Sequence, residues 1–267
     1  MWAMANPRSR SITSPKNPLV QRFSGAAAGE DPGVLLAEGP RLVREGLEAG
    51  LEVVAAAVAP SIRDPELAEQ LRSRSGEFFE CSESVLARMS ALDTHQGVAV
   101  LFARPKFVEQ DLLRGDLAPL VVAVAGVRDP GNLGSLLRSA EAAGVSGILT
   151  LQGGADPWRD KAVRGSMGSV FRVPVEHGRS AEGVVQFARD HKLQLVVAAG
   201  EGAVDYTECD FRRPLLLVLG GEARGVPAEI REVAEQCVRV PLRAPVESLN
   251  VAVAAGVLLF EARRQRR

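Results

Sequence analysis

Cysteine and histidine are scarce in this sequence of 267 residues. Each occurs three times, and the six positions are scattered: Cys81, Cys209, Cys237, His95, His177 and His191. No CxxC pair is present, and no histidine lies close to a second candidate ligand. Zinc sites and disulfide frameworks need such spacings. The sequence therefore predicts no metal site and no disulfide framework.

Long hydrophobic runs are also missing. No run approaches the roughly 18 uncharged apolar residues that a membrane-spanning helix needs. The opening segment MWAMANPRSRSITSPKNP is polar and broken by prolines, so it lacks the apolar core of a signal peptide. We therefore expect no membrane partner and a cytoplasmic protein.

The common nucleotide and hydrolase motifs are absent too. The first glycine-rich turn after a strand reads GVRDPGNLG, which supplies neither GxGxxG nor GxxxxGK[ST]. Asp156 is poorly placed for the acid that would hold a ribose about 20 residues further on. There is no GxSxG, and no histidine lies near a candidate serine or cysteine. By elimination, any pocket is made of backbone, amide, hydroxyl and guanidinium groups.

The net charge of −1 argues against a nucleic-acid partner, but the positive charges are unevenly spread. Three basic clusters stand out: residues 8–22, the segment WRDKAVRGSMGSVFR (158–172) and the C-terminal ARRQRR (262–267). Phosphate contacts need local basic patches and not a basic total. Each cluster alone is equally compatible with an ordinary solvated surface.

Strand-like and helix-like segments alternate along the chain, which predicts an α/β fold with helices covering a mixed or parallel sheet. The first half has expected strands at 34–39, 53–59, 77–81 and 97–103. A polar, proline-bracketed stretch follows. We therefore predict a smaller N-terminal α/β domain at 1–105, a linker at 106–118 and a second domain at 119–267.

The second domain begins with LVVAVAG (120–126), which is apolar throughout, as a strand buried on both faces should be. A helix is expected from Leu133 to Ala143, with Asn132 as its N-cap and Gly144 as its stop. Further strands are expected at 147–151, 170–175, 193–200, 214–221 and 238–242. Helices are expected near 181–191 and 227–236 and at the C-terminus.

Three strand–loop–helix units would bring a set of polar side chains to one pocket: Asn132, Arg138, Glu222, Ser248 and Asn250. Each residue also has a simpler interpretation. Asn132 and Ser248 could only cap helices, Arg138 could pair with Glu141 on the surface, and Glu222 could brace a loop. The coincidence of all five favours a functional site.

These segments carry a family resemblance. The stretch NLGSLLR (132–138) resembles the first motif of the SpoU/TrmH family of RNA 2′-O-ribose methyltransferases, within the SPOUT superfamily. LGGEARGVP (219–227) resembles the second motif, with Glu222 at its acidic position. VPLRAPVESLNVAVAAGVLL (240–259) resembles the third, with Ser248 and Asn250 at its polar positions. The N-terminal segments 12–23 and 35–50 resemble, more loosely, a ribosomal-protein-like RNA-binding domain.

The resemblance implies a SPOUT domain with a deep trefoil knot and a homodimer. It also implies S-adenosylmethionine as cofactor, with no metal required. The cofactor-binding positions would be Leu219, Gly220, Gly221, Val240, Pro241 and Leu249. Gly220 and Gly221 would let the backbone approach the ligand closely.

The implied reaction is methylation of a ribose 2′-hydroxyl in RNA, with catalytic positions Arg138, Asn132, Glu222, Ser248 and Asn250. The family assigns proton removal to the arginine that Arg138 matches. Because a guanidinium stays protonated in proteins, we expect Arg138 to hold a phosphate and stabilise the developing alkoxide.

We expect ribosomal (23S) RNA as the substrate. The alternatives are transfer RNA, a catalytically silent RNA-binding protein of the same fold, and a small-molecule enzyme with a nucleotide cofactor.

Overall fold

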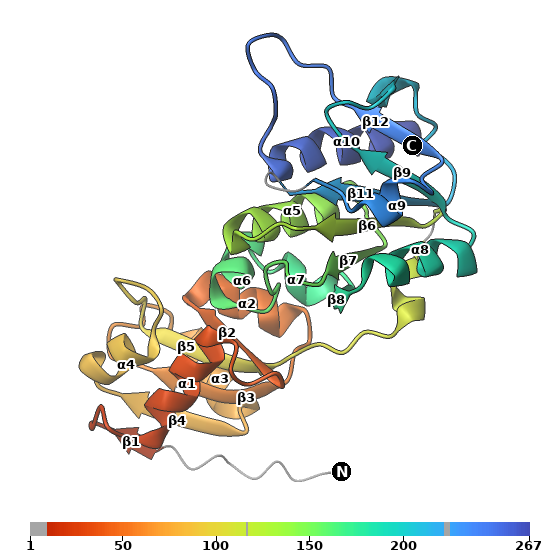
Figure 1. The fold of residues 1–267 in the computed structure, drawn as a ribbon. Helices are drawn as coiled ribbons and strands as arrows, with labels where there is room; N and C mark the ends of the chain where they lie inside the picture. The colour runs from red at the N-terminus through yellow and green to blue at the C-terminus, as the bar shows by residue number, and fades with distance from the viewer. Residues whose placement is uncertain (1–9, 116, 222–224) are drawn as a thin grey trace. The chain divides into compact units, whose positions relative to one another are not determined.

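The computed structural model describes residues 10–115, 117–221 and 225–267 (Figure 1). These residues form two compact units. The first holds the described chain up to Pro105 together with Trp158–Phe171, and the second holds Lys106–Pro157 and Arg172–Arg267. The segment 158–171, which the sequence places inside the second domain, therefore packs as part of the first unit.

The first unit is built on a mixed sheet with the strand order β1-β4-β3-β5-β2. The strands are β1 (Arg10–Ile12), β2 (Val34–Glu38), β3 (Val53–Val58), β4 (Glu77–Cys81) and β5 (Val98–Ala103). β5 is antiparallel to β2 and β3, while β4 is parallel to β1 and β3. The helices are α1 (Pro18–Ala28), α2 (Pro40–Glu48), α3 (Pro65–Arg74) and α4 (Glu83–Met89). The sequence predicts the last four strands but not β1 or α1.

A short excursion of the chain completes this unit with α6 (Asp160–Ser166) and α7 (Ser169–Arg172). The Phe171 ring lies 6.2 Å from the Phe102 ring of β5. The predicted strand at 170–175 is wrong, because 170–172 belong to α7 and β8 (Val175–Arg179) starts only at Val175. Val170 and Phe171 are typical strand formers, but burial against the first unit overrides that preference.

The second unit is built on a sheet with the order β10-β12-β9-β11-β6-β7-β8, in which every described pair of neighbours is parallel. The strands besides β8 are β6 (Leu120–Ala125), β7 (Gly147–Leu151), β9 (Gln194–Ala198), β10 (Val204–Asp205), β11 (Leu215–Gly220) and β12 (Gln236–Arg239). This sheet confirms the predicted α/β class with mainly parallel strands.

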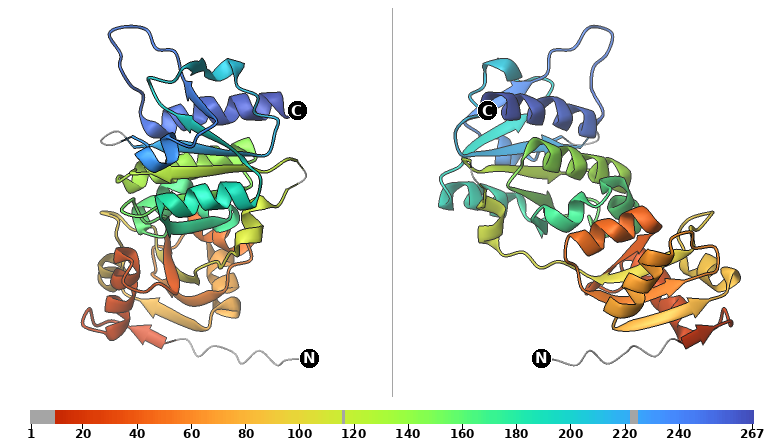
Figure 2. Two further views of the ribbon diagram at one scale, coloured as in Figure 1. Left: turned by 45° about the vertical axis from the view of Figure 1, so that its right-hand side comes forward. Right: turned by 180° about the vertical axis from the view of Figure 1, so that it is seen from behind.

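Helices cover both faces of the second sheet. On one face α8 (Ala181–Asp190) and α9 (Ala228–Arg231) pack on alternate residues of the central strands, with the short helix η1 (Glu109–Leu113) beside them. On the other face α5 (Pro130–Ala143) and α10 (Val251–Gln265) lie side by side (Figure 2). A further short helix, η2 (Tyr206–Glu208), contacts α10. Over the described residues, no helix combines the length and apolarity of a membrane span.

The segments after β11 are shorter than predicted. The expected helix near 227–236 is only the single turn α9, and the expected strand at 238–242 is β12, which ends at Arg239. Val240 and Pro241 therefore lie in an irregular loop that runs to Asn250. Because this loop begins at the carboxyl end of β12, it can line a cavity at that edge of the sheet.

The C-terminal basic cluster is largely used inside the second unit. The Arg266 guanidinium donates to the carbonyl oxygens of Phe211 at 2.6 Å, Arg213 at 2.7 Å and Pro119 at 3.4 Å, and also to that of Ala118. Burial lowers the pKa of Arg266 below its usual range. Arg266 therefore ties the end of the chain to the segments that lead into β6 and β11.

We expect Arg266→Ala to lower the free energy of unfolding by about 2–3 kcal/mol, because several carbonyl groups lose a charged donor. Arg266→Lys should recover little of the lost free energy of unfolding, since an ammonium cannot reproduce the planar arrangement of guanidinium donors. Urea unfolding monitored by circular dichroism measures both. Arg267→Ala, at an exposed position, is the control and should stay within about 0.5 kcal/mol. Equal stability of the 266 and 267 variants would contradict this role.

Candidate active site

The two asparagines of the predicted site lie at the first turns of two different helices. In α5 the N-cap is Asp129, whose Oδ1 accepts from the Asn132 backbone N–H at 2.9 Å. The prediction that Asn132 caps this helix is therefore wrong, since the proline at 130 lets the helix start earlier. Asn250 is the N-cap of α10, and its Oδ1 accepts from the backbone N–H groups of Ala252 at 2.9 Å and Val253 at 3.4 Å. Ser248 thus lies before the cap.

A hydrogen bond joins these asparagines across 118 positions of sequence: Asn250 Nδ2 donates to Asn132 Oδ1 at 3.0 Å. Near the other ends of the helices, Arg263 Nη1 donates to the Ala142 carbonyl oxygen at 2.8 Å. α5 and α10 therefore run in the same direction, with their N-termini together. A helix N-terminus carries a partial positive charge. Two of them side by side favour negative charge developing next to the asparagine pair.

Arg138 lies on the exposed surface of α5. The pairing with Glu141 that its spacing allows is not formed. Glu141 instead accepts from Arg172, with Nε to Oε1 at 2.5 Å and Nη2 to Oε2 at 3.0 Å. Over the described part of the chain, Arg138 has no ion pair and no hydrogen bond from its side chain to either asparagine. The described residues therefore leave its guanidinium available to a ligand or a partner molecule.

A cavity of about 330 Å³ lies at the carboxyl ends of β9, β11 and β12, next to the start of α10. Five of the six predicted cofactor-binding residues line it: Leu219, Gly220, Gly221, Val240 and Leu249. Ser248, which is exposed, lines it as well. Pro241 is exposed and is not part of its wall. We refer to this space as the first cavity.

The structure adds a packing reason for Gly220 and Gly221 to the predicted approach of a ligand. A Cβ on Gly220 would lie 2.4 Å from the Gly225 carbonyl carbon, and one on Gly221 would lie 2.4 Å from the Gly126 carbonyl oxygen. Both glycines are therefore needed because protein loops pack against each other there. The packing holds the walls of the first cavity in place.

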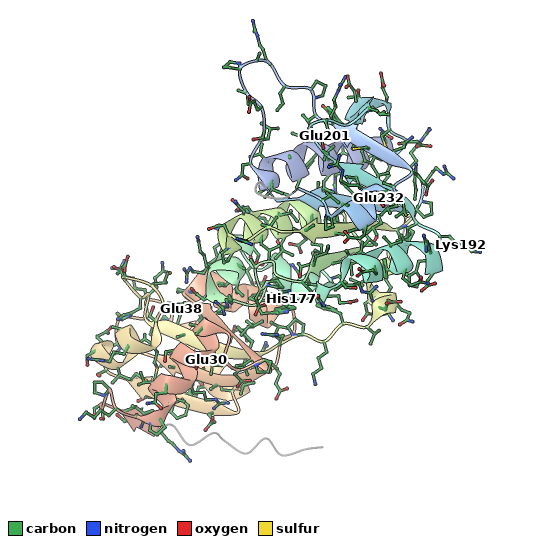
Figure 3. The ribbon with its side chains drawn as sticks, viewed as in Figure 1. Glu30, Glu38, His177, Lys192, Glu201 and Glu232 are labelled. Carbon is green, nitrogen blue, oxygen red and sulfur yellow. The ribbon has the colours of Figure 1, made fainter. Side chains whose placement is uncertain are left out.

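The first cavity has a wall that the sequence-based prediction missed, formed by the last residue of β9, Ala198, and by Ala199, Gly200 and Glu201 after it. Glu201 accepts from Arg231 Nη2 at 2.7 Å and is labelled in Figure 3. The signal was present in the sequence, because Gly200 comes after a buried parallel strand, as Gly221 does. Additional apolar groups of the wall are Leu242, Val251, Ala254 and Leu258.

None of the three cysteines lines the first cavity. Burial raises the pKa of Cys81 and of Cys209 to about 11, and that of Cys237 is raised as well. All three cysteines are therefore protonated thiols at neutral pH. Within residues 10–115, 117–221 and 225–267, no group of three or more histidine, cysteine or acidic side chains is placed to hold a metal ion.

Glu222, the fifth predicted catalytic residue, lies outside the described residues. The structure thus brings Asn132 and Asn250 together, with Ser248 nearby on the wall of the first cavity. It leaves Arg138 on the neighbouring helix surface. The second unit is an α/β domain with a ligand-sized cavity at the carboxyl edge of a parallel sheet, the edge where such folds bind ligands.

Comparisons with known proteins agree with this architecture. The SpoU rRNA methylase family matches residues 119–260, and an MRM3-like substrate binding domain matches residues 30–100. The chain belongs to the SpoU rRNA methylase family and is an RNA methyltransferase of that family.

Similar curated proteins include an uncharacterized tRNA/rRNA methyltransferase of Synechocystis, 33% identical over 96% of this chain and 94% of that protein. A 23S rRNA (guanosine-2′-O-)-methyltransferase RlmB of Xanthomonas axonopodis is 33% identical over 80% of this chain and 88% of that protein.

Among solved structures, an AdoMet-bound rRNA methyltransferase from Sinorhizobium meliloti has a TM-score of 0.86 and 32% identity, with 96% of this chain and 98% of that chain covered. AviRb from Streptomyces viridochromogenes, in complex with AdoMet, has a TM-score of 0.85 and 27% identity over 94% and 98% of the two chains.

The double role of Asn250 can be separated by substitution. Asn250→Ala removes the cap of α10 and should lower the free energy of unfolding by about 1 kcal/mol. Asn250→Ser keeps a capping oxygen but cannot reach Asn132, so its stability should stay within about 0.5 kcal/mol of the unsubstituted protein. Urea unfolding compares the two. An equal loss in both variants would show that the bond to Asn132, and not the cap, carries the stability.

Proposed function

We propose that this chain methylates the 2′-hydroxyl of a ribose in RNA with S-adenosylmethionine as methyl donor. The observation that carries the proposal is the asparagine pair at two joined helix N-termini, beside a cavity walled by the family's second and third motifs. The AdoMet-bound Sinorhizobium structure and the 2′-O-methyltransferase relative support the same reaction.

The first cavity suits an adenosyl group that carries a cationic sulfonium. Its apolar side chains, among them Leu219, Leu242 and Leu249, would enclose the adenine. The Glu201 carboxylate also lies on the wall, where it is paired with Arg231. Bound S-adenosylmethionine supplies a methyl group activated by the positive sulfonium. No group of the protein needs to activate it further.

The residues of the chain then act on the RNA. In the proposed reaction the ribose oxygen would take the methyl group from the sulfonium, which would leave as a neutral thioether, and the hydroxyl proton would pass to solvent water. Asn132 and Asn250 are placed to orient the hydroxyl, and the two helix N-termini stabilise alkoxide character as it develops. Arg138 holds a neighbouring phosphate. Holding both reactants in line supplies a large share of the acceleration.

A homodimer is part of the proposal and has support in an exposed apolar face of α10. Val253 and Phe260 are 53% and 50% exposed and lie seven positions apart, so they share one helix face. Large exposed apolar side chains on one face are typical of contact surfaces. Arg138 is exposed on the adjacent helix, where it could serve the site of a partner copy.

The deep trefoil knot that the family resemblance implies is also part of the proposed function.

We propose 23S ribosomal RNA as the substrate class, in keeping with the Xanthomonas relative, and a cytoplasmic location with it. Residues 1–105 would bind the RNA and residues 119–267 would transfer the methyl group. Removal of residues 1–105 would uncover the segment 158–171, which includes the buried Trp158 and Phe171. The roles of the two units are therefore better tested with surface substitutions than with a truncation.

We expect Arg138→Ala to lower methyl transfer by about 100-fold or more, because the guanidinium that holds the neighbouring phosphate and keeps the ribose in line is lost. The assay uses tritiated S-adenosylmethionine and RNA from cells that lack this protein. Calorimetric titration should show unchanged binding of S-adenosylmethionine. Arg189→Ala, at another exposed arginine of the second unit, is the control.

Two outcomes would count against the proposal. Full activity of Arg138→Ala removes Arg138 from the mechanism. A wild-type protein that binds RNA but not S-adenosylmethionine is a silent RNA-binding protein of the same fold.

We expect Phe260→Glu to convert a dimer into a monomer, because a carboxylate would be buried without a partner at the contact face. Size-exclusion chromatography with light scattering measures the mass. Val233→Glu, at an apolar side chain that is 41% exposed elsewhere on the second unit, is the matched control and should remain dimeric. A monomeric wild-type protein would refute the dimer.

A further inference from the structure

A second cavity adjoins the first at the carboxyl edge of the sheet. It measures about 880 Å³ and lies among the loops that follow β6, β7 and β11. Gly225, Val226 and Arg231 line both spaces, so the two cavities share a wall. The second cavity is lined by none of the described residues to which the proposed chemistry gives a role, namely Asn132, Arg138, Ser248 and Asn250. The proposed chemistry therefore does not explain this cavity.

Three glycines from three different loops face this second cavity. Gly126, Gly153 and Gly225 have φ values of 68°, 76° and 62°, in the left-handed region that favours glycine. Among the described residues, no atom lies within 4 Å of the place where a Cβ would stand on any of them. The wall at these points is bare backbone next to open space, against which a flat group can lie closely.

The charged side chains of the second cavity include one unpaired group of each sign. Arg128 and Glu232 are both exposed, and neither has an ion pair over the described part of the chain (Figure 3 labels Glu232). Arg231 already forms an ion pair, with its Nη2 at 2.7 Å from Glu201 Oε1. Among the residues that the structure describes, nothing pairs with the Arg128 guanidinium or the Glu232 carboxylate, so the cavity offers a donor and an acceptor together with the exposed amide of Gln152.

This combination selects among the parts of an RNA chain. A phosphate would satisfy Arg128 but would be repelled by Glu232. A guanine base satisfies both, because O6 and N7 accept from an arginine while N1–H and the 2-amino group donate to a carboxylate. Adenine offers a carboxylate only its single exocyclic amino group, and pyrimidines lack the N7 acceptor.

We propose that the second cavity receives a guanine base of the substrate RNA, with Arg128 and Glu232 as the residues that determine this specificity. The inference rests on the proposed function, since it assumes that RNA reaches this edge of the sheet. The shared wall places the base next to the methyl-transfer site, so guanine recognition would position the strand for methylation.

The test measures binding of fluorescein-labelled UUUGUUU, UUUIUUU and UUUAUUU to the full chain by fluorescence anisotropy at one fixed salt concentration. Inosine differs from guanine only by the missing 2-amino group. The wild-type protein should bind the guanine oligonucleotide about tenfold more tightly than the adenine one, with inosine between them.

Two variants separate the contacts. Arg128→Ala should reduce the guanine-to-adenine ratio from about tenfold to about threefold, because Glu232 still favours guanine, and Glu232→Ala should make guanine and inosine bind alike. Arg189→Ala removes an exposed arginine elsewhere on the second unit and should leave both ratios unchanged. Equal wild-type binding of guanine and adenine would overturn the proposal. So would an equal loss for all three oligonucleotides in Arg128→Ala, which indicates a phosphate contact.

Calorimetric titration with S-adenosylmethionine keeps this inference apart from the proposed function. A protein that binds S-adenosylmethionine and methylates RNA but does not distinguish guanine from adenine refutes only the guanine site. A protein that does not bind S-adenosylmethionine refutes the proposed function itself, whatever the oligonucleotides show.

Discussion

The parallel pairing of β6 with β11 is the constraint on which both cavities depend. The two strands pair in register from Leu120 opposite Leu215 to Ala125 opposite Gly220, and nearly all of these residues are buried. Because the strands are parallel, the loops that follow them emerge at the same edge. The Gly221 backbone N–H donates to the Ala125 carbonyl at 2.7 Å, which continues the pairing into the loops. Polar loops that are far apart in sequence are thereby fixed around shared spaces.

The parallel arrangement of α5 and α10 sets the electrostatics at this edge. Two helices that run in the same direction place like partial charges together, which is unfavourable without compensation. Here the bond between Asn132 and Asn250 and the bond from Arg263 to the Ala142 carbonyl hold them in place. The positive ends therefore meet at the asparagine pair, where we propose that methyl transfer takes place. A developing alkoxide or an RNA phosphate would supply the missing negative charge.

Arginines serve two different purposes in this protein. Arg266, Arg263 and Arg172 bond to carbonyl oxygens or carboxylates of the second unit, so much of the basic character that suggested RNA contacts maintains structure. Arg128 and Arg138 are exposed and have no ion pair over the described residues. Arg128 lies at the carboxyl edge of the sheet, and Arg138 lies on the exposed surface of α5. Availability to a ligand thus depends on local packing and not on density of charge along the chain.

The sequence by itself determined the α/β class, the run of buried strands and the three loops that carry the family motifs, because burial on both faces imposes apolar runs and loop motifs are local. It could not determine that Asp129 and Asn250 are the caps, because the start of a helix depends on which competing side chain reaches the free N–H groups. Nor could it show that 158–171 packs with the first unit, or that Gly220 and Gly221 accommodate Gly225 and Gly126. The tertiary structure decided these points, since each depends on contacts between residues far apart in the chain, and it alone placed Asn132 against Asn250.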